Sequence, residues 1–195
     1  ILKNQNYSSD IINTILYSNK IENNVIKINT SNSNNIVNKI SYSNNPIVDT
    51  YTHFLSDEEC DYFINISKNK FKKSLVSDSN KGIISKGRTG STAWIPHNFS
   101  EITKNVGERI SKIIGIPLKN AESFQVIYYD IKQKYNDHYD SWDHDNSDKT
   151  LRCIEYGGSR LMTALCYLNT VEKGGETRLS KLNITIPSEK GKLLV

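Results

Sequence analysis

The sequence has few cysteines, no long apolar run and no dense block of basic residues. Three cysteines in 195 residues are too few for a disulfide scaffold, and their spacing matches no zinc motif. One disulfide with a free thiol and three reduced thiols are both open, so the cysteines do not decide the compartment. No apolar segment approaches the roughly 20 residues that a membrane helix needs, so we expect no membrane span. The net charge of +4 comes without a Lys/Arg stripe, which argues against a nucleic-acid partner.

Composition divides the chain into two parts. Residues 1–45 contain 13 asparagines among many Ile, Lys and Ser residues. Their SNSNN and SNN runs are typical of turns or linkers, although short alternating runs such as 25–28 are candidate strands. We interpret this part as a peripheral N-terminal extension. Residues 46–195 are expected to form one domain, which is long enough to bury a hydrophobic core.

Two amphipathic helices are expected in the first half of this domain. Ser56 and Glu59 form a capping-box pattern, and apolar residues at helical spacing follow, which predicts a helix over 57–70. A second apolar stripe predicts a helix over about 99–114, ended by a Gly-x-Pro sequence. The segment 77–92 between them is rich in Gly and Ser and is typical of a loop.

After Pro117 the apolar period changes from 3.6 to 2, which indicates strands. We expect strands over 123–129, 161–168, 183–186 and 192–195. Helices followed by several short strands are typical of an α+β domain. For metal and small-ligand chemistry in that setting, we predict a double-stranded β-helix (jelly-roll) core with flanking helices and the N-terminal extension.

His138 and Asp140 are the pair around which we expect the chain to be built. In an extended segment, side chains two residues apart lie on the same face, so both could reach one metal ion. A His-x-Asp pair with a distant second His is the facial triad of non-haem Fe(II) oxygenases. That triad leaves coordination positions for a co-substrate and O₂. A lone His-x-Asp pair is weak evidence, because such pairs arise often by chance.

The other histidines and the nearby tyrosines have simpler explanations. His144 lies between two aspartates and could belong to a second metal site, but a solvated acidic loop is the more ordinary interpretation. His53 and His97 are most simply surface or core-edge imidazoles. The tyrosines around the pair could be strand packing, because aromatic residues favour strands.

Several motifs in a specific order and spacing give the pair its context. They are FLSDEEC at 54–60, RTGSTAW at 88–94, IPLKNAESFQVIYY at 116–129, KYNDHYD at 134–140, GGSRLMTALCYLNTVEKGGETRL at 157–179 and PSEKGKLLV at 187–195. Together they resemble the catalytic domain of the Fe(II)- and 2-oxoglutarate-dependent prolyl 4-hydroxylases, from about Ile47 to Val195. The Asn-, Ile- and Lys-rich composition would suit a large DNA virus or a protist.

The resemblance implies roles for the matching positions. His138 and Asp140 would be two iron ligands and the catalytic pair. Tyr129 and Thr177 would hydrogen-bond the far carboxylate of 2-oxoglutarate, which is reasonable because a buried carboxylate needs hydroxyl donors. The positions near a peptide substrate would be Arg160, Tyr135, Arg88 and Trp94.

Three features depart from the family pattern. The family's second iron-binding His, and the Lys that pairs with 2-oxoglutarate, follow its last strand. We therefore expect the third ligand beyond Val195 and regard the domain as C-terminally incomplete over these residues. Lys132 stands where the family usually has Gly, and Lys181 lies in a turn where Pro is common.

The function implied by the resemblance is hydroxylation of peptidyl proline in proline-rich or collagen-like sequences. It would use Fe(II), 2-oxoglutarate and O₂, with ascorbate to rescue oxidised iron. A related lysyl hydroxylase, a catalytically silent peptide-binding module of the same fold and a purely structural jelly roll are alternatives. The family favours the secretory pathway, and a viral origin would allow a place in the virion. The sequence indicates no oligomeric state.

Overall fold

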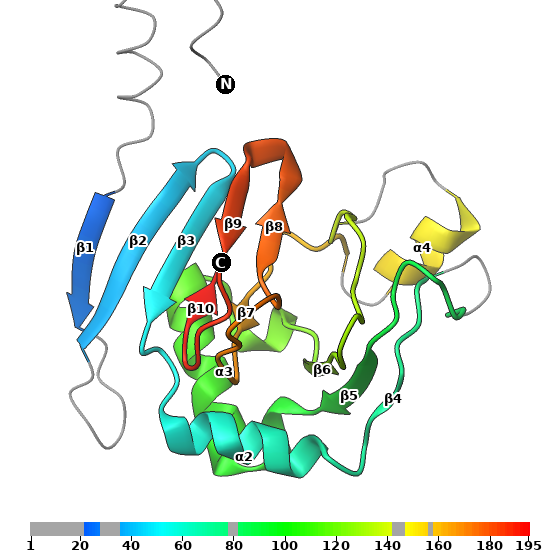
Figure 1. Ribbon diagram of the computed structural model, residues 1–195, viewed down its shortest axis with the longest axis horizontal. Coiled ribbons are helices and arrows are strands. Elements are labelled where there is room, and N and C mark those ends of the chain that lie inside the picture. Colours follow the sequence, from blue (N-terminus) through cyan, green and yellow to red (C-terminus); the bar gives the residue numbers. More distant parts are fainter. Residues whose placement is uncertain (1–21, 28–35, 78–81, 142–146, 156–157) are drawn as a thin grey trace, which may run out of the picture.

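The computed structural model describes residues 22–27, 36–77, 82–141, 147–155 and 158–195. It has a mixed α+β arrangement in which the strands form antiparallel sheets (Figure 1). His144 and most of the N-terminal extension lie outside the described residues. None of the helices in the described segments is long and apolar enough to cross a bilayer.

The largest sheet joins the two ends of the domain. Its order is β1 (Glu22–Lys27), β2 (Ile36–Asn44), β3 (Ile47–Thr52), β10 (Leu193–Leu194) and β7 (Leu165–Cys166). All neighbours in it are antiparallel. Figure 1 shows the red strand β10 beside the cyan β3, so the last described residues lie in the middle of the sheet.

Strand β2 begins inside the segment that composition marks as an extension. It pairs with β3 from Asn38 opposite Thr52 to Asn44 opposite Ile47, with a register shift between Ser41 and Ser43. Val37 of β2 is fully buried in the main core. Residues 36–44 are therefore part of the sheet, and the compositional change after residue 45 falls in the turn that joins two paired strands.

Two smaller sheets complete the strand pairing of the described residues. One has the order β4 (Lys72–Lys73), β5 (Ser91–Ile95) and β6 (Phe124–Tyr128), and the other pairs β8 (Thr177–Leu179) with β9 (Ile184–Ile186). The strands expected over 123–129 and 183–186 are confirmed. The strand expected over 161–168 is regular only at β7. Strand β5 was not expected, because its Ser-Thr-Ala start is weakly apolar, and in the structure it pairs with β6 while Ala93 and Ile95 are buried in the main core.

The two expected helices are present. Helix α2 (Asp57–Ser67) begins with the predicted capping box, because the Glu59 N–H donates to the Ser56 hydroxyl and the Ser56 N–H donates to the Glu59 carboxylate. Helix α3 (Glu101–Ile114) ends at Gly115, whose φ of 71° is the left-handed conformation that glycine adopts readily. Helix α4 (Asp148–Ile154) was not expected. The described segments also form short 3₁₀ helices, η2 (His97–Phe99), η3 (Leu118–Asn120) and η4 (Ser180–Leu182).

The main hydrophobic core lies where α2 and α3 meet the large sheet and the β5–β6 pair. Its buried members are Val37, Tyr51, Phe54, Leu55, Cys60, Phe63, Ala93, Ile95, Val106, Val126 and Leu193. Cys60 and Cys166 are free thiols, and burial raises their pKa values to about 11 and about 12, so neither is a reactive thiolate. His97 packs edge-on against Phe124 at the border of this core, which confirms its expected place.

A buried ion pair connects α3 to the start of α2. Two guanidinium nitrogens of Arg109 lie 2.6 and 2.7 Å from the two carboxylate oxygens of Glu59, and one of them also donates to the Phe54 carbonyl at 3.2 Å. The Arg109 side chain is 8% exposed. The same Glu59 carboxylate completes the capping box, so one side chain serves both the helix start and the helix–helix contact.

Replacing Arg109 with Met should destabilise the fold by about 3 kcal/mol, because the change leaves a partly buried Glu59 carboxylate without its cation. Urea unfolding followed by circular dichroism measures this loss. The matched control is Lys112→Met, on the exposed side of the same helix, which should change the unfolding free energy by less than about 0.5 kcal/mol. Equal effects of the two substitutions would contradict a stabilising role for the ion pair.

Candidate active site

A short backbone ladder positions the His138 segment. After β6 the chain turns back and runs beside the loop that precedes β5. The Thr89 N–H donates to the Lys134 carbonyl at 2.9 Å, and the Asn136 N–H donates to the Gly87 carbonyl at 2.8 Å. Between these bonds, Arg88 and Tyr135 form an antiparallel bridge. The ladder therefore ties residues 134–136, just before His138 and Asp140, to the segment that leads into β5.

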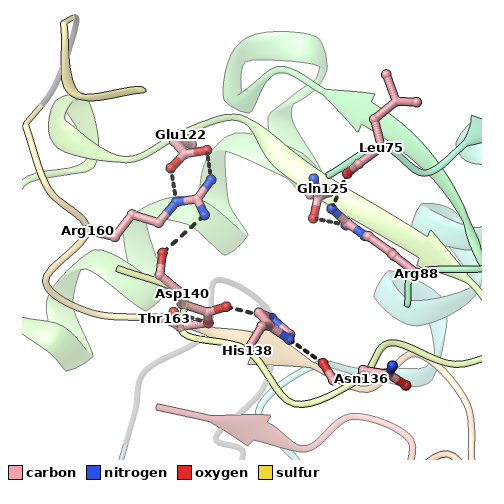
Figure 2. A network of polar contacts seen from close by, with 9 residues as sticks. All are labelled: Leu75, Arg88, Glu122, Gln125, Asn136, His138, Asp140, Arg160 and Thr163. Carbon is pink, nitrogen blue, oxygen red and sulfur yellow. Dashed lines mark hydrogen bonds and ion pairs between the residues drawn. The ribbon is translucent and has the colours of Figure 1, made fainter. Parts of the chain in front are cut away.

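The side chains of His138 and Asp140 face each other (Figure 2). His138 Nε2 lies 3.1 Å from Asp140 Oδ1, and His138 Nδ1 lies 2.8 Å from the Asn136 carbonyl oxygen. A carbonyl oxygen can only accept, so Nδ1 carries a proton, and in the neutral imidazole the lone pair of Nε2 then faces the carboxylate. Two lone-pair atoms this close require a proton or a cation between them.

That requirement is reflected in the pKa values of the metal-free pair. The hydrogen bond to Asp140 raises the pKa of His138 above its ordinary value. The hydrogen bond from His138, followed by one from Thr163, lowers the pKa of Asp140. Each group thus favours the charged form of the other, and a bound cation would replace the shared proton.

A second segment holds Asp140 from the opposite side. The Thr163 hydroxyl donates to Asp140 Oδ2 at 2.6 Å, and Arg160 Nη1 donates to the Asp140 backbone carbonyl at 3.3 Å. Arg160 also makes a two-pronged ion pair with Glu122, in which Nη2 lies 2.9 Å from Oε2 (Figure 2). Because Thr163 uses one carboxylate oxygen, the other is left directed at His138.

Aromatic stacking holds His138. The rings of Tyr135 and His138 are stacked with centroids 3.6 Å apart and planes 18° from parallel. The guanidinium carbon of Arg88 lies 4.7 Å from the centroid of the Tyr135 ring, within the range of a cation–π contact. Arg88 itself is 9% exposed.

The remaining candidate residues lie in different places. Tyr129 packs against Gly90, where an added Cβ would come within 2.7 Å of the Tyr129 ring, so the close approach requires glycine. Burial raises the pKa of the Tyr129 phenol, which keeps it a hydrogen-bond donor. Trp94 is 51% exposed and stands opposite Gln125, hence on the same face of the β5–β6 pair. Thr177 belongs to a separate contact, in which its hydroxyl accepts from Tyr167 at 2.7 Å.

Comparison with known proteins shows the family of the chain. No protein-family model matches the chain. The curated relatives include three from Arabidopsis thaliana: probable prolyl 4-hydroxylase 7, which is 41% identical over 134 residues (68% of this chain and 40% of the relative), probable prolyl 4-hydroxylase 6, at 37% over 145 residues (73% and 46%), and probable prolyl 4-hydroxylase 3, at 37% over 140 residues (71% and 47%). The chain belongs to the prolyl 4-hydroxylase family. The chain spans less than half the length of each of the three Arabidopsis relatives.

One backbone conformation near the site is unusual. Lys132, at a position where the family resemblance predicts Gly, has a φ of 66°. This left-handed conformation costs a residue with a Cβ roughly 1 kcal/mol. The turn is held by Gln133, whose side-chain oxygen accepts the Asp130 N–H at 2.8 Å. The departure from Gly is therefore accommodated within the turn that leads into the site.

The spacing of the two donor atoms fits a shared metal ion. Ligands at right angles and about 2.1 Å from a metal lie roughly 3 Å apart, and His138 Nε2 and Asp140 Oδ1 are separated by 3.1 Å. Within the described segments, no group of three His, Cys, Asp or Glu side chains could hold a metal ion. The described residues therefore bring together two candidate metal ligands, His138 and Asp140.

Sequence reasoning did not identify Thr163 or Glu122. Each acts on the site through a partner that is distant in the sequence, Asp140 for Thr163 and Arg160 for Glu122. Thr163 lies within the stretch predicted as a strand, where nothing local marks it as different from any other strand threonine. Glu122 stands in the IPLKNAESFQVIYY motif, but its type alone does not reveal an ion pair.

Replacing Thr163 with Val should weaken Fe(II) binding about tenfold, because residues that orient a metal ligand typically contribute 10- to 100-fold to affinity. The measurement is an anaerobic Fe(II) titration of the full-length gene product. Thr163→Ser keeps the hydroxyl and should bind Fe(II) as the wild type does. Wild-type affinity in the Val variant would show that Thr163 does not orient Asp140.

In metal-free protein, Asp140→Asn should lower the pKa of His138 toward its ordinary value of 6.5. Because the pKa of His138 is raised, its contribution to the stability of the fold is complete below pH 6.5 and is lost as the pH rises through the raised pKa. Because the pKa of Asp140 is lowered, its contribution to stability is complete above pH 3.8 and is lost as the pH falls through the lowered pKa. The pair should therefore stabilise the fold most between these two ordinary values.

Imidazole proton shifts followed by NMR across this range give the His138 pKa, and His53, an exposed imidazole, is the internal reference. Unfolding in urea with EDTA present tests the stability window. An unchanged His138 titration in Asp140→Asn would contradict the pairing.

Proposed function

We propose that this chain carries the iron-binding part of a prolyl 4-hydroxylase that hydroxylates peptidyl proline in proline-rich or collagen-like sequences. The observation that carries the proposal is the convergence of His138 Nε2 and Asp140 Oδ1 within a chain similar to several prolyl 4-hydroxylases. The cofactors that go with this function are Fe(II), the co-substrate 2-oxoglutarate and ascorbate. We also propose that the antiparallel sheets belong to a jelly-roll core.

The proposed iron ligands are His138 and Asp140. Bound Fe(II), together with 2-oxoglutarate and O₂, would supply the oxidising power to convert a proline C–H bond to C–OH. The chain's own contribution is orientation. The Asn136 carbonyl keeps the Nδ1 proton of His138 in place, and Thr163 keeps one oxygen of Asp140 directed at the imidazole.

Tyr129 and Thr177 are the proposed donors to the far carboxylate of 2-oxoglutarate. Tyr129 is suited to this because its phenol stays protonated, and it lies beside the cationic Arg88, which favours a nearby anion. The Thr177 hydroxyl accepts a hydrogen bond from the Tyr167 hydroxyl, so its own proton is available to donate. Removing these donors should raise the concentration of 2-oxoglutarate needed for turnover.

The proposed contacts of the peptide are Trp94 and Arg160. Trp94 presents a half-exposed indole on the β5–β6 face that also carries Gln125. Polyproline II segments bind well to exposed aromatic side chains, because the peptide is already extended and loses little entropy. Arg160, which is paired with Glu122, lies at the edge of the proposed iron-binding pair.

Succinate release from 2-oxoglutarate by the full-length gene product, with Fe(II) and ascorbate, tests this function. A proline-rich peptide should stimulate release, a collagen-like peptide with lysine as its target should not, and His138→Ala should reduce release to background. His53→Asn is the matched control, because it changes an exposed imidazole at a φ of 56° that Asn tolerates.

Each other outcome would redirect the proposal. Stimulation by the lysine peptide alone would indicate a lysyl hydroxylase. Binding of the proline-rich peptide without succinate release would indicate a peptide-binding module that lacks catalysis. Undiminished release in His138→Ala would remove His138 from the iron site.

A further inference from the structure

The Arg88 side chain is held by contacts within the protein more firmly than we expect of a residue that contacts a peptide substrate. Its Nη1 donates to the Leu75 carbonyl at 2.9 Å, and its Nη2 donates to the Gln125 side-chain oxygen at 2.9 Å (Figure 2). With 9% of its surface exposed, the side chain is enclosed by the protein. Both terminal nitrogens therefore have protein partners, and little of the guanidinium is available to a peptide.

The enclosed guanidinium contacts the same aromatic ring as the His138 imidazole. Arg88 Cζ is 4.7 Å from the Tyr135 ring centroid, and the centroid of the His138 ring is 3.6 Å from the Tyr135 centroid, with planes 18° apart. The Arg88–Tyr135 backbone bridge holds these two residues in register. The Tyr135 ring is thus placed by Arg88 and in turn limits the tilt of the imidazole.

The tilt of the His138 ring matters because one hydrogen bond does not determine it. The Asn136 carbonyl fixes where Nδ1 points, but the ring can still rotate about that bond and move Nε2 away from Asp140. A parallel aromatic ring at van der Waals distance blocks this rotation. The contact with Tyr135 therefore completes the orientation that the backbone carbonyl begins.

We propose that Arg88 is a positioning residue for the metal-binding imidazole and acts on His138 through the Tyr135 ring. The proposal rests on the function proposed above, and it gives Arg88 a role other than direct contact with the peptide. It also connects the β5–β6 pair to the metal site, because Gln125 of β6 holds the same guanidinium. The flat, charged fork of Arg88 suits this place, since it can donate two hydrogen bonds while lying over a ring.

The test measures metal affinity directly and does not depend on turnover. Co(II) is titrated into the full-length gene product, and its visible absorption spectrum reports the ligand geometry. Arg88→Met should raise the Co(II) dissociation constant about tenfold, the lower end of the range for residues that orient a ligand, and should change the spectrum. The KM for the proline-rich peptide should stay at the wild-type value.

Three further variants separate positioning from general damage. Lys86→Met removes the same charge from an exposed residue of the same loop and should leave Co(II) binding unchanged. Arg88→Lys keeps a cation near the ring and should recover part of the affinity. Tyr135→Leu should weaken binding as Arg88→Met does, and combining the two should add little, because both act through the same ring.

Several outcomes would overturn the inference. They are wild-type Co(II) affinity in Arg88→Met, a raised peptide KM with an unchanged Co(II) affinity, and additive losses in the double variant. Should Arg88→Met fail to fold, as judged by thermal unfolding, Tyr135→Leu and Arg88→Lys decide the question, because wild-type affinity in both would exclude the positioning role. Failure of the proposed function gives a different result. In that case the wild type releases no succinate, but its Co(II) affinity still depends on Arg88.

Discussion

The site depends on the backbone ladder between residues 87–89 and 134–136. Without it, the chain after β6 would be a surface loop, and loops are the more mobile parts of a protein. The ladder gives residues 134–136 the spacing of paired strands, so that Tyr135 meets Arg88 and the Asn136 carbonyl meets the imidazole of His138. A site on a loop thereby gains the rigidity of a sheet edge, which precise ligand geometry requires.

The Arg109–Glu59 and His138–Asp140 ion pairs differ in their burial and in what they connect. Arg109 and Glu59 are mostly buried and make two short hydrogen bonds, and they join two helices across the core. The His138–Asp140 contact is more open, with side chains 37% and 46% exposed. The greater exposure leaves this contact accessible, and Thr163, Asn136 and Tyr135 orient it in place of burial.

Two backbone features shape the approach to the candidate site. Lys132 has a left-handed conformation at a position where the family resemblance predicts Gly, and Gly90 leaves room for the Tyr129 ring. Both lie outside the His138–Asp140 pair itself. The chain spans less than half the length of its curated relatives.

The sequence by itself determined the features whose cause is local. Each of these features depends on residues that are close together in the sequence. They are the capping box of Ser56 and Glu59, the end of α3 at Gly115 and the contact between His138 and Asp140. Tertiary structure alone decided the rest. Strand β5 forms because β6 pairs with it, β2 extends the sheet into an Asn-rich segment because β3 is its partner, and Thr163 reaches Asp140 across 23 positions. Such contacts depend on how the chain folds back on itself, and neither residue type nor spacing encodes that locally.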